Sequence, residues 1–170
     1  ADVDRMTGGM QRKSLTLLGA RPSMGKSSVM VSSSLCAARK GHGVGILSLE
    51  MDAASLMARA LSDLTLNGYT PIPYVDLIQG RMDKGKLAHI EQMNQRLHSY
   101  PIQVEEAGGN VFDIRMKIES MMERFEREGK PRLDVLMLDH LGFVQPGSHY
   151  KGNRNNEIGE ITRALKDYAK

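Results

Sequence analysis

Residues 20–27 read Ala-Arg-Pro-Ser-Met-Gly-Lys-Ser, and this run constrains the fold of the 170-residue chain more than any other feature. It fits the phosphate-binding loop pattern, in which a small residue and four variable positions precede Gly-Lys-Ser. In such a loop, backbone N–H groups turn inward around phosphate oxygens, and the following helix points its positive N-terminus at the same anion. Gly25 permits close approach of the backbone, Lys26 supplies a charge for the β- and γ-phosphates, and Ser27 supplies a hydroxyl for Mg²⁺. The expected nucleotide-binding residues are Arg21, Pro22, Ser23, Met24, Gly25, Lys26, Ser27 and Ser28.

The residues around this loop predict the strand and the helix that such a loop needs. Residues 14–19, which read Ser-Leu-Thr-Leu-Leu-Gly, predict a short buried strand that leads into the loop. Residues 28–39 predict a helix that leaves it and stops before the glycines that follow. The run departs from the common pattern at Ala20, where glycine is usual. A plain glycine turn is the alternative interpretation, and the strand, loop and helix order favours a nucleotide site.

The composition is that of an ordinary globular protein, with 41% apolar and 25% charged residues. No apolar run approaches the roughly 18–20 residues of a membrane span, and the chain does not start with a secretory pattern. The single cysteine, Cys36, cannot form a disulfide within the chain, which agrees with a reducing compartment. We therefore expect a cytoplasmic protein without a membrane partner. The net charge of +3 permits nucleic-acid binding but does not establish it.

Strands and helices alternate along the rest of the chain, which predicts an α/β fold with a mostly parallel sheet covered by helices. The expected strands lie at residues 44–50, 102–106 and 133–139. Further helices are expected after Asp52, near residues 84–98, after Asn110, and at the C-terminal end. Asp52 and Asn110 are the expected N-caps. A polar loop is expected from Gln145 to Asn155.

Two acidic residues that end expected strands are candidate site residues. Asp139 ends the strand at 133–139, where its carboxylate would orient Mg²⁺ against the loop serine. A simple cap at the strand end is the alternative for Asp139. Glu50 ends the strand at 44–50, where a carboxylate can orient or deprotonate an attacking water. Position alone leaves this role for Glu50 and that of a solvated acid equally open.

Four segments occur in one order with plausible spacing: residues 4–10 (Asp-Arg-Met-Thr-Gly-Gly-Met), 20–27, 48–51 (Ser-Leu-Glu-Met) and 138–141 (Leu-Asp-His-Leu). Together they resemble the helicase domain of DnaB-type replicative helicases. Residues 155–170 also resemble the helix that follows the metal-binding strand in that family. The resemblance covers nearly the whole chain, and it implies a RecA-like P-loop ATPase core in a three-layer α/β/α arrangement.

The resemblance implies a function and a set of residue roles. It implies a motor that forms a homohexameric ring around single-stranded DNA and moves 5′ to 3′ at the replication fork, with ATP as its fuel. By motif match, Lys26 would bind the β- and γ-phosphates, while Ser27 and Asp139 would hold Mg²⁺. Glu50 would activate the attacking water. Primase and a helicase loader are partners that the resemblance suggests for the longer protein.

The residues after Asp139 depart from the common family pattern. Many members continue with Tyr-Leu-Gln, whereas this chain continues with His140 and has Gly142 at the last of these positions. Some phage primase–helicases carry the same Asp-His pair, so His140 is a candidate sensor of the γ-phosphate; a packed polar side chain is the alternative. Arg21 and Arg59 also stand where the family commonly has arginine. A surface salt bridge is the alternative for each.

The polar loop at residues 145–155 carries two fixed positive charges and no acidic residue. By resemblance, Lys151 and Arg154 would contact the DNA backbone without reading its sequence. A flexible surface loop is the alternative. We expect residues 1–170 to form a single ATPase domain that lacks the family's N-terminal domain. On the C-terminal side it would lack the second DNA loop and the arginine finger, so that the isolated chain hydrolyses ATP poorly.

Other functions are compatible with a phosphate-binding loop. A RecA- or RadA-like recombination ATPase would share the fold, a P-loop kinase would pass the phosphate to a small molecule, and a regulatory module would bind nucleotide without useful turnover. The Ser-Leu-Glu-Met segment and the residues after Asp139 favour the helicase over the recombinase. A kinase would need a basic lid over its acceptor, and the sequence offers no convincing one.

Overall fold

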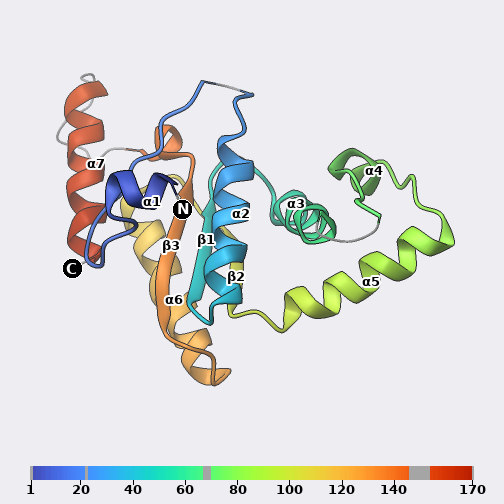
Figure 1. Ribbon diagram of the computed structural model, residues 1–170. Helices are drawn as coiled ribbons and strands as arrows, with labels where there is room; N and C mark the ends of the chain where they lie inside the picture. Colours follow the sequence, from blue (N-terminus) through green and yellow to red (C-terminus); the bar gives the residue numbers. More distant parts are fainter. Residues whose placement is uncertain (1, 22, 67–69, 146–153, 170) are drawn as a thin grey trace.

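The structure is a computed structural model that describes residues 2–21, 23–66, 70–145 and 154–169. Within these residues a parallel sheet of three strands occupies the centre, in the order β2-β1-β3 (Figure 1). The strands are β1 (Gly43–Ser48), β2 (Ile102–Glu106) and β3 (Leu133–Asp139). Parallel neighbours require long crossover connections, and helices supply them here. The predicted α/β class with a parallel sheet is confirmed.

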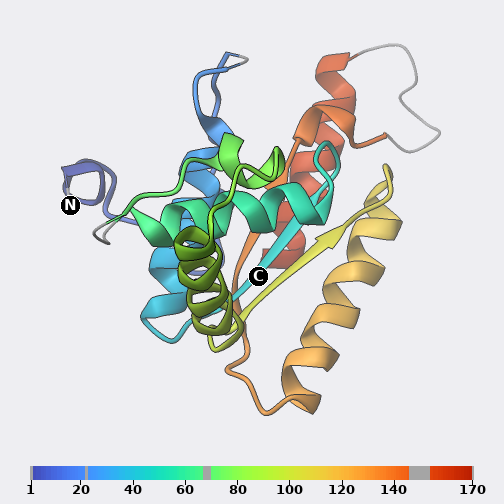
Figure 2. The same cartoon turned by 90° about the vertical axis from the view of Figure 1, so that its right-hand side faces the viewer.

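Helices cover both faces of this sheet. In chain order they are α1 (Asp2–Thr7), α2 (Lys26–Arg39), α3 (Ala53–Thr65), α4 (Tyr74–Ile78), α5 (Lys84–His98), α6 (Val111–Arg127), the 3₁₀ helix η1 (Leu141–Phe143) and α7 (Arg154–Ala169). Figure 2 shows α2 and α3 on one side of the strands and α6 on the other. The short α4 and the longer α5 extend outward beside α3 (Figure 1). The three-layer α/β/α arrangement is therefore present.

Helix starts follow local side-chain chemistry. The first N–H groups of a helix have no partner within the helix, so a short polar side chain just before it stabilises the start. Asp52 accepts from the Ser55 N–H at 2.7 Å at the start of α3, and Asn110 accepts from the Asp113 N–H at 2.8 Å at the start of α6. Both predicted N-caps are confirmed.

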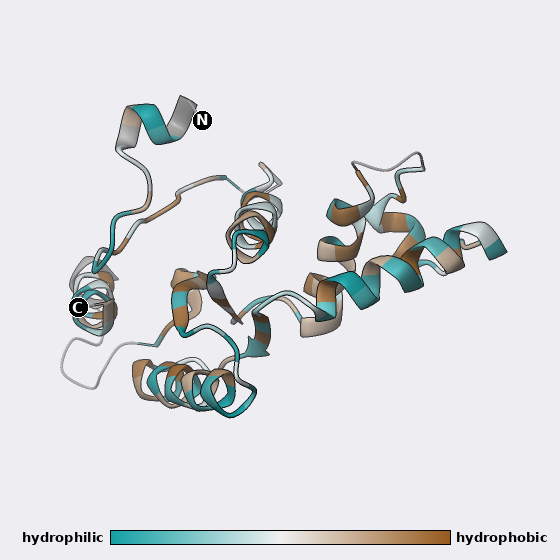
Figure 3. Cartoon of the chain, turned by 60° about the horizontal axis from the view of Figure 1, so that its bottom comes forward, coloured by the Kyte–Doolittle hydropathy of each residue, from teal (hydrophilic) through white to brown (hydrophobic). Residues whose placement is uncertain are grey.

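The alternation of side chains along β1 separates two apolar cores. Val44 and Ile46 point toward α2 and α3, while Leu47 points toward α6. Gly45 also lies on the α6 side, where a Cβ atom would come within 3.0 Å of the Met121 sulfur. Glycine at this position therefore lets α6 approach the sheet closely. Figure 3 shows the mixture of apolar and polar residues on α5 and α6 that is typical of amphipathic helices.

The predicted strand at residues 14–19 is wrong, because these residues form neither strand nor helix. Leu15 packs against the core beneath α6 and α7, but Leu17 is 61% exposed and Leu18 is 58% exposed. A short apolar run forms a strand only if the edge of a sheet is available to pair with it. In the described part of the chain, no strand follows β3 at that edge of the sheet. The segment instead runs from α1 to α2 as an irregular connection (Figure 1).

Other boundaries also differ from expectation. Helix α2 begins at Lys26, two residues before the predicted start, so its first turn belongs to the Gly-Lys-Ser motif. Strand β1 ends at Ser48, and Glu50 therefore lies in the turn after the strand rather than at its end. Helix α4 has no counterpart among the predicted helices, because its five residues are too few for a periodic pattern. Of the loop expected at 145–155, residues 146–153 lie outside the described residues.

Candidate nucleotide-binding site

Residues 23–25 of the phosphate-binding pattern lead directly into α2, and the Met24 N–H donates to the Arg21 carbonyl oxygen at 3.2 Å. Gly25 stands just before the helix with φ of +83°, a left-handed conformation that glycine adopts at low cost. No side chain caps this end of α2, and Ser23 also has a positive φ, of +64°. The first N–H groups of α2 are therefore free of a side-chain cap, as an anion-binding helix N-terminus requires.

The first turn of α2 brings two side chains onto one buried carboxylate. Lys26 Nζ lies 2.8 Å from Asp139 Oδ1, and the Ser27 hydroxyl donates to Asp139 Oδ2, also at 2.8 Å. Asp139 is the last residue of β3 and is only 3% exposed, whereas the Lys26 side chain is 27% exposed. Ser27 and Asp139 are 112 positions apart in the chain. The fold thus brings three predicted site residues together at the carboxyl edge of the sheet, where ligands of parallel α/β proteins bind.

The donor set at this point fits a magnesium ion. Mg²⁺ prefers oxygen ligands and is commonly held by one or two protein groups together with substrate phosphates and water. The Asp139 carboxylate and the Ser27 hydroxyl are such oxygens, and they already lie in direct contact. Among the described residues no group of three or more His, Cys, Asp and Glu side chains could form a separate metal cage. The site therefore suits a metal that arrives with a phosphate ligand.

Glu50 lies beside this cluster but does not touch it through a hydrogen bond found in the structure. Its neighbour Leu49 donates its N–H to the carbonyl oxygen of Asp139, which ties the turn after β1 to the end of β3. The Glu50 side chain is exposed. The carboxylate is therefore at the same edge of the sheet as Asp139 and is accessible to solvent, as a residue that orients water must be.

His140 follows Asp139 and is half-buried against η1. Its ring lies 4.6 Å from the Phe143 ring, measured between centroids, at an interplanar angle of 33°. The ring contact agrees with the simple packing role. However, His140 Nδ1 is buried and has no hydrogen-bond partner within the described part of the chain. Packing alone leaves this nitrogen unexplained, because buried polar atoms are usually paired.

Of the other predicted site residues, some are exposed near the phosphate loop and some lie outside the described part of the chain. Arg21, Ser23, Met24 and Ser28 are exposed on the loop and the first turn of α2. Pro22 and Lys151 lie outside the described residues, and Arg154 is described only as the first residue of α7. The structure therefore does not show a DNA-contacting surface at the predicted loop.

Arg59, the second arginine at a family position, lies on α3. Its guanidinium carbon is 4.3 Å from the centre of the Tyr74 ring, so it stacks between α3 and the start of α4. This is a cation–π contact, whereas a surface salt bridge was the alternative interpretation for Arg59.

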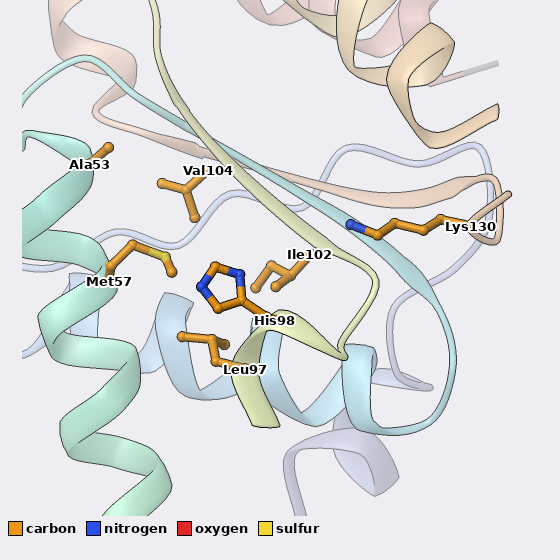
Figure 4. A pocket seen from close by; sticks show the side chains of 7 residues that line it. All are labelled: Ala53, Met57, Leu97, His98, Ile102, Val104 and Lys130. Atoms are coloured by element: carbon orange, nitrogen blue, oxygen red, sulfur yellow. The ribbon is translucent and has the colours of Figure 1, made fainter. Parts of the chain in front are cut away.

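A cavity of about 260 Å³ opens elsewhere, between α3, the end of α5 and β2. In Figure 4 the His98 ring lies near Met57 and Ile102, and Lys130 stands to one side. Neither Lys26 nor Asp139 lines this cavity. The cavity is therefore not part of the candidate nucleotide site around Lys26 and Asp139.

Sequence reasoning missed two polar residues at the same carboxyl edge. Strand register places Ser48 of β1 opposite Asp139 of β3 on one side and opposite Glu106 of β2 on the other. Ser48 is 2% exposed, and Glu106 is exposed. The signal for Glu106 was available, because it is a third acid at the end of an expected strand.

Comparisons with known proteins agree with this geometry. The family model described as "DnaB-like helicase C terminal domain" matches residues 1–170. The chain is 32% identical over 169 residues to the replicative DNA helicase DnaB of Helicobacter pylori, covering 99% of this chain and 32% of that protein. It is 29% identical over 172 residues to the replicative DNA helicase DnaC of Bacillus subtilis, covering 99% and 35%. The chain thus spans about a third of these curated relatives.

Solved structures show the same similarity in three dimensions. A DnaB-like replicative helicase, described with its interactions with primase, superposes with a TM-score of 0.78 at 25% identity, over 99% of this chain and 39% of that one. A second solved structure, described as an ATPase domain, gives a TM-score of 0.78 at 26% identity, over 99% and 57%. No described helix is long and apolar enough to cross a membrane.

Proposed function

The chain belongs to the DnaB-like helicase C-terminal domain family, and from this premise we propose that it is the ATP-driven motor of a replicative DNA helicase. Its RecA-like fold and its similarity to helicase ATPase domains agree with nucleotide use. The observation that carries the proposal is the convergence of Lys26 and Ser27 on the buried carboxylate of Asp139, at 2.8 Å in each case. These are the three side-chain types that a P-loop ATPase gathers around the phosphates and the metal ion of its substrate.

Each residue of the cluster has a role in the proposed reaction. The N-terminus of α2 and the Lys26 ammonium bind the β- and γ-phosphates, so Lys26 must leave Asp139 when ATP enters. Ser27 and Asp139 would hold Mg²⁺, which neutralises charge on the phosphates when it is bound. Glu50 orients a water molecule for attack on the γ-phosphorus and accepts its proton. The bond between the γ-phosphorus and the oxygen that bridges it to the β-phosphate breaks, and ADP and phosphate are the products.

The finer parts of the proposal extend to the longer protein. We propose a homohexameric ring that encircles single-stranded DNA at the replication fork, with Lys151 and Arg154, the first residue of α7, facing the central channel. Its proposed partners are primase and a helicase loader. We also propose that a neighbouring subunit supplies the arginine finger. His140 is proposed to sense the γ-phosphate through its unpaired buried nitrogen. Residues 1–170 are proposed to form one ATPase domain of that protein, which acts in the cytoplasm.

A strand-displacement assay on the full-length protein tests this proposal. With ATP and Mg²⁺, we expect unwinding of forks that carry a 5′ tail. The Glu50→Gln variant should still bind nucleotide but lose about 10²-fold or more in hydrolysis, since general base catalysis contributes that much. Glu91→Gln, at an exposed position on α5, is the matched control and should retain activity. Unwinding from a 3′ tail alone, or strand exchange without unwinding, would overturn the helicase assignment.

A further inference from the structure

The turn that carries Glu50 is hydrogen-bonded to a side chain of β1. It runs from Leu49 to Asp52, between β1 and α3. The Met51 N–H donates to the Ser48 hydroxyl oxygen at 2.9 Å, and Ser48 itself is only 2% exposed. Ser48 is in turn fixed by its place in the sheet, where its carbonyl accepts from the Ala107 N–H at 3.0 Å. The residue directly after Glu50 is therefore anchored to a buried side chain on the central strand.

A second anchor comes from the neighbouring strand. Glu106 Oε1 accepts from the Ala53 N–H at 3.0 Å. Ala53 is the first residue of α3, so this N–H has no partner within the helix, and a carboxylate here also interacts favourably with the helix dipole. The register of β1 and β2 places Glu106 opposite Ser48. The two anchors thus approach the turn from adjacent strands.

We propose that Ser48 and Glu106 are positioning residues for Glu50. They hold the backbone on the C-terminal side of Glu50 at two N–H groups, those of Met51 and Ala53. The contact between Leu49 and the Asp139 carbonyl holds the other side. The inference rests on the proposed role of Glu50 in hydrolysis. It adds that two side chains with no assigned role in binding the nucleotide set the place of the Glu50 carboxylate.

The physical reason is the steep dependence of catalysis on placement. A displacement of about 1 Å at a reacting group can cost about 10²-fold in rate. Leu49 and Met51 pack against the two apolar cores, whereas Glu50 between them is exposed. The Glu50 side chain therefore depends on the backbone on either side of it, which the hydrogen bonds of Leu49, Met51 and Ala53 hold in place. Loss of either anchor should move Glu50 without changing the contacts of Lys26 and Ser27. The turnover number should therefore fall while nucleotide binding stays the same.

Steady-state ATP hydrolysis by the full-length protein with DNA tests this. Glu106→Ala and Ser48→Ala should each lower kcat by about tenfold, with KM for ATP within about twofold of the native value. Glu106→Gln should recover most of kcat, because the amide oxygen still accepts the Ala53 N–H. Asp83→Ala is the matched control, because Asp83 accepts the Lys86 N–H at 2.8 Å at the start of α5, far along the chain from the site. It should leave kcat unchanged.

The combination with Glu50→Gln separates positioning from general damage. If Glu106 acts through Glu50, adding Glu106→Ala to Glu50→Gln should lower kcat by less than about twofold further. A full additional tenfold loss, a rise in KM that matches the fall in kcat, or native kcat in both alanine variants would overturn the inference. A native rate in Glu50→Gln alone would instead remove Glu50 from the proposed mechanism. The two failures are therefore distinguishable.

Discussion

Replacing Lys26 by alanine should destabilise the nucleotide-free protein, in addition to impairing nucleotide binding. The reason is the burial of Asp139, whose carboxylate is 3% exposed and accepts from Lys26 and Ser27. Without Lys26, the carboxylate keeps a single neutral donor, the Ser27 hydroxyl. A buried charge that loses its ionic partner cannot recover its hydration, so the folded state loses free energy relative to the unfolded state.

The size of this effect follows from the geometry of the pair. Breaking a buried ion pair by removing one partner typically costs about 3–5 kcal/mol. The Lys26 side chain is 27% exposed, so water weakens the attraction and the lower end, about 3 kcal/mol, is expected. With a urea m-value of about 2 kcal/mol/M, the unfolding midpoint should fall by about 1.5 M. Asp139→Asn should cost less, because the amide still accepts from Ser27 and Lys26 can turn toward solvent.

Urea unfolding in EDTA at one fixed protein concentration measures these effects. The double variant Lys26→Ala/Asp139→Asn should lose about 2 kcal/mol less free energy of unfolding than the two single variants lose in sum. The control is the Lys86–Asp76 pair, which has the same 2.8 Å separation and the same 27% exposure of lysine, but a carboxylate that is 19% exposed. Lys86→Ala should therefore shift the midpoint much less. Additive single losses within about 0.5 kcal/mol, or an equal shift for Lys86→Ala, would refute the reasoning.

Two further predictions concern the sheet. Gly43→Ala should lower the free energy of unfolding by about 2 kcal/mol or more in thermal unfolding, because its Cβ would lie 2.2 Å from the Arg132 carbonyl oxygen. Gly159→Ala is the control, since its Cβ would have no atom within 4 Å. It should be neutral or stabilise α7 by up to about 1 kcal/mol. Hydrogen bonding from His42, followed by that from Arg132, lowers the pKa of Asp134 below its usual 3.8. Since the pKa is lower in the folded state, the stability that Asp134 contributes is present above about pH 4 and is lost as the pH falls through the lowered value. Unfolding measured from pH 6 to pH 2.5 should show a weaker decline for Asp134→Asn.

The local elements were largely predictable because their causes are local. Strands 102–106 and 133–139 and the helix at 84–98 were predicted with the bounds that the structure has. Their apolar periodicity and the polar residues before the helices act over a few positions. The strand predicted at residues 14–19 was wrong because a strand also needs a distant partner strand. Its leucines indicate a strand only where an edge pairs with them, and Leu17 and Leu18 are instead exposed.

The site divides in the same way. The Gly-Lys-Ser pattern indicated a phosphate loop, since backbone conformation and helix start depend on neighbouring residues. The sequence also placed Asp139 at a strand end, but it could not show that one buried carboxylate receives both Lys26 and Ser27.

By itself, then, the sequence predicted a phosphate-binding loop, the order of most strands and helices, and Asp139 at the end of its strand, because each depends on short-range chemistry. Tertiary structure alone decided which of these residues meet. Strand register set Ser48 between Asp139 and Glu106, and the packing of α2 and α3 brought the helix starts to that edge. Contacts between residues as far apart as 112 positions arise from the packing of the whole chain, and no local pattern records them.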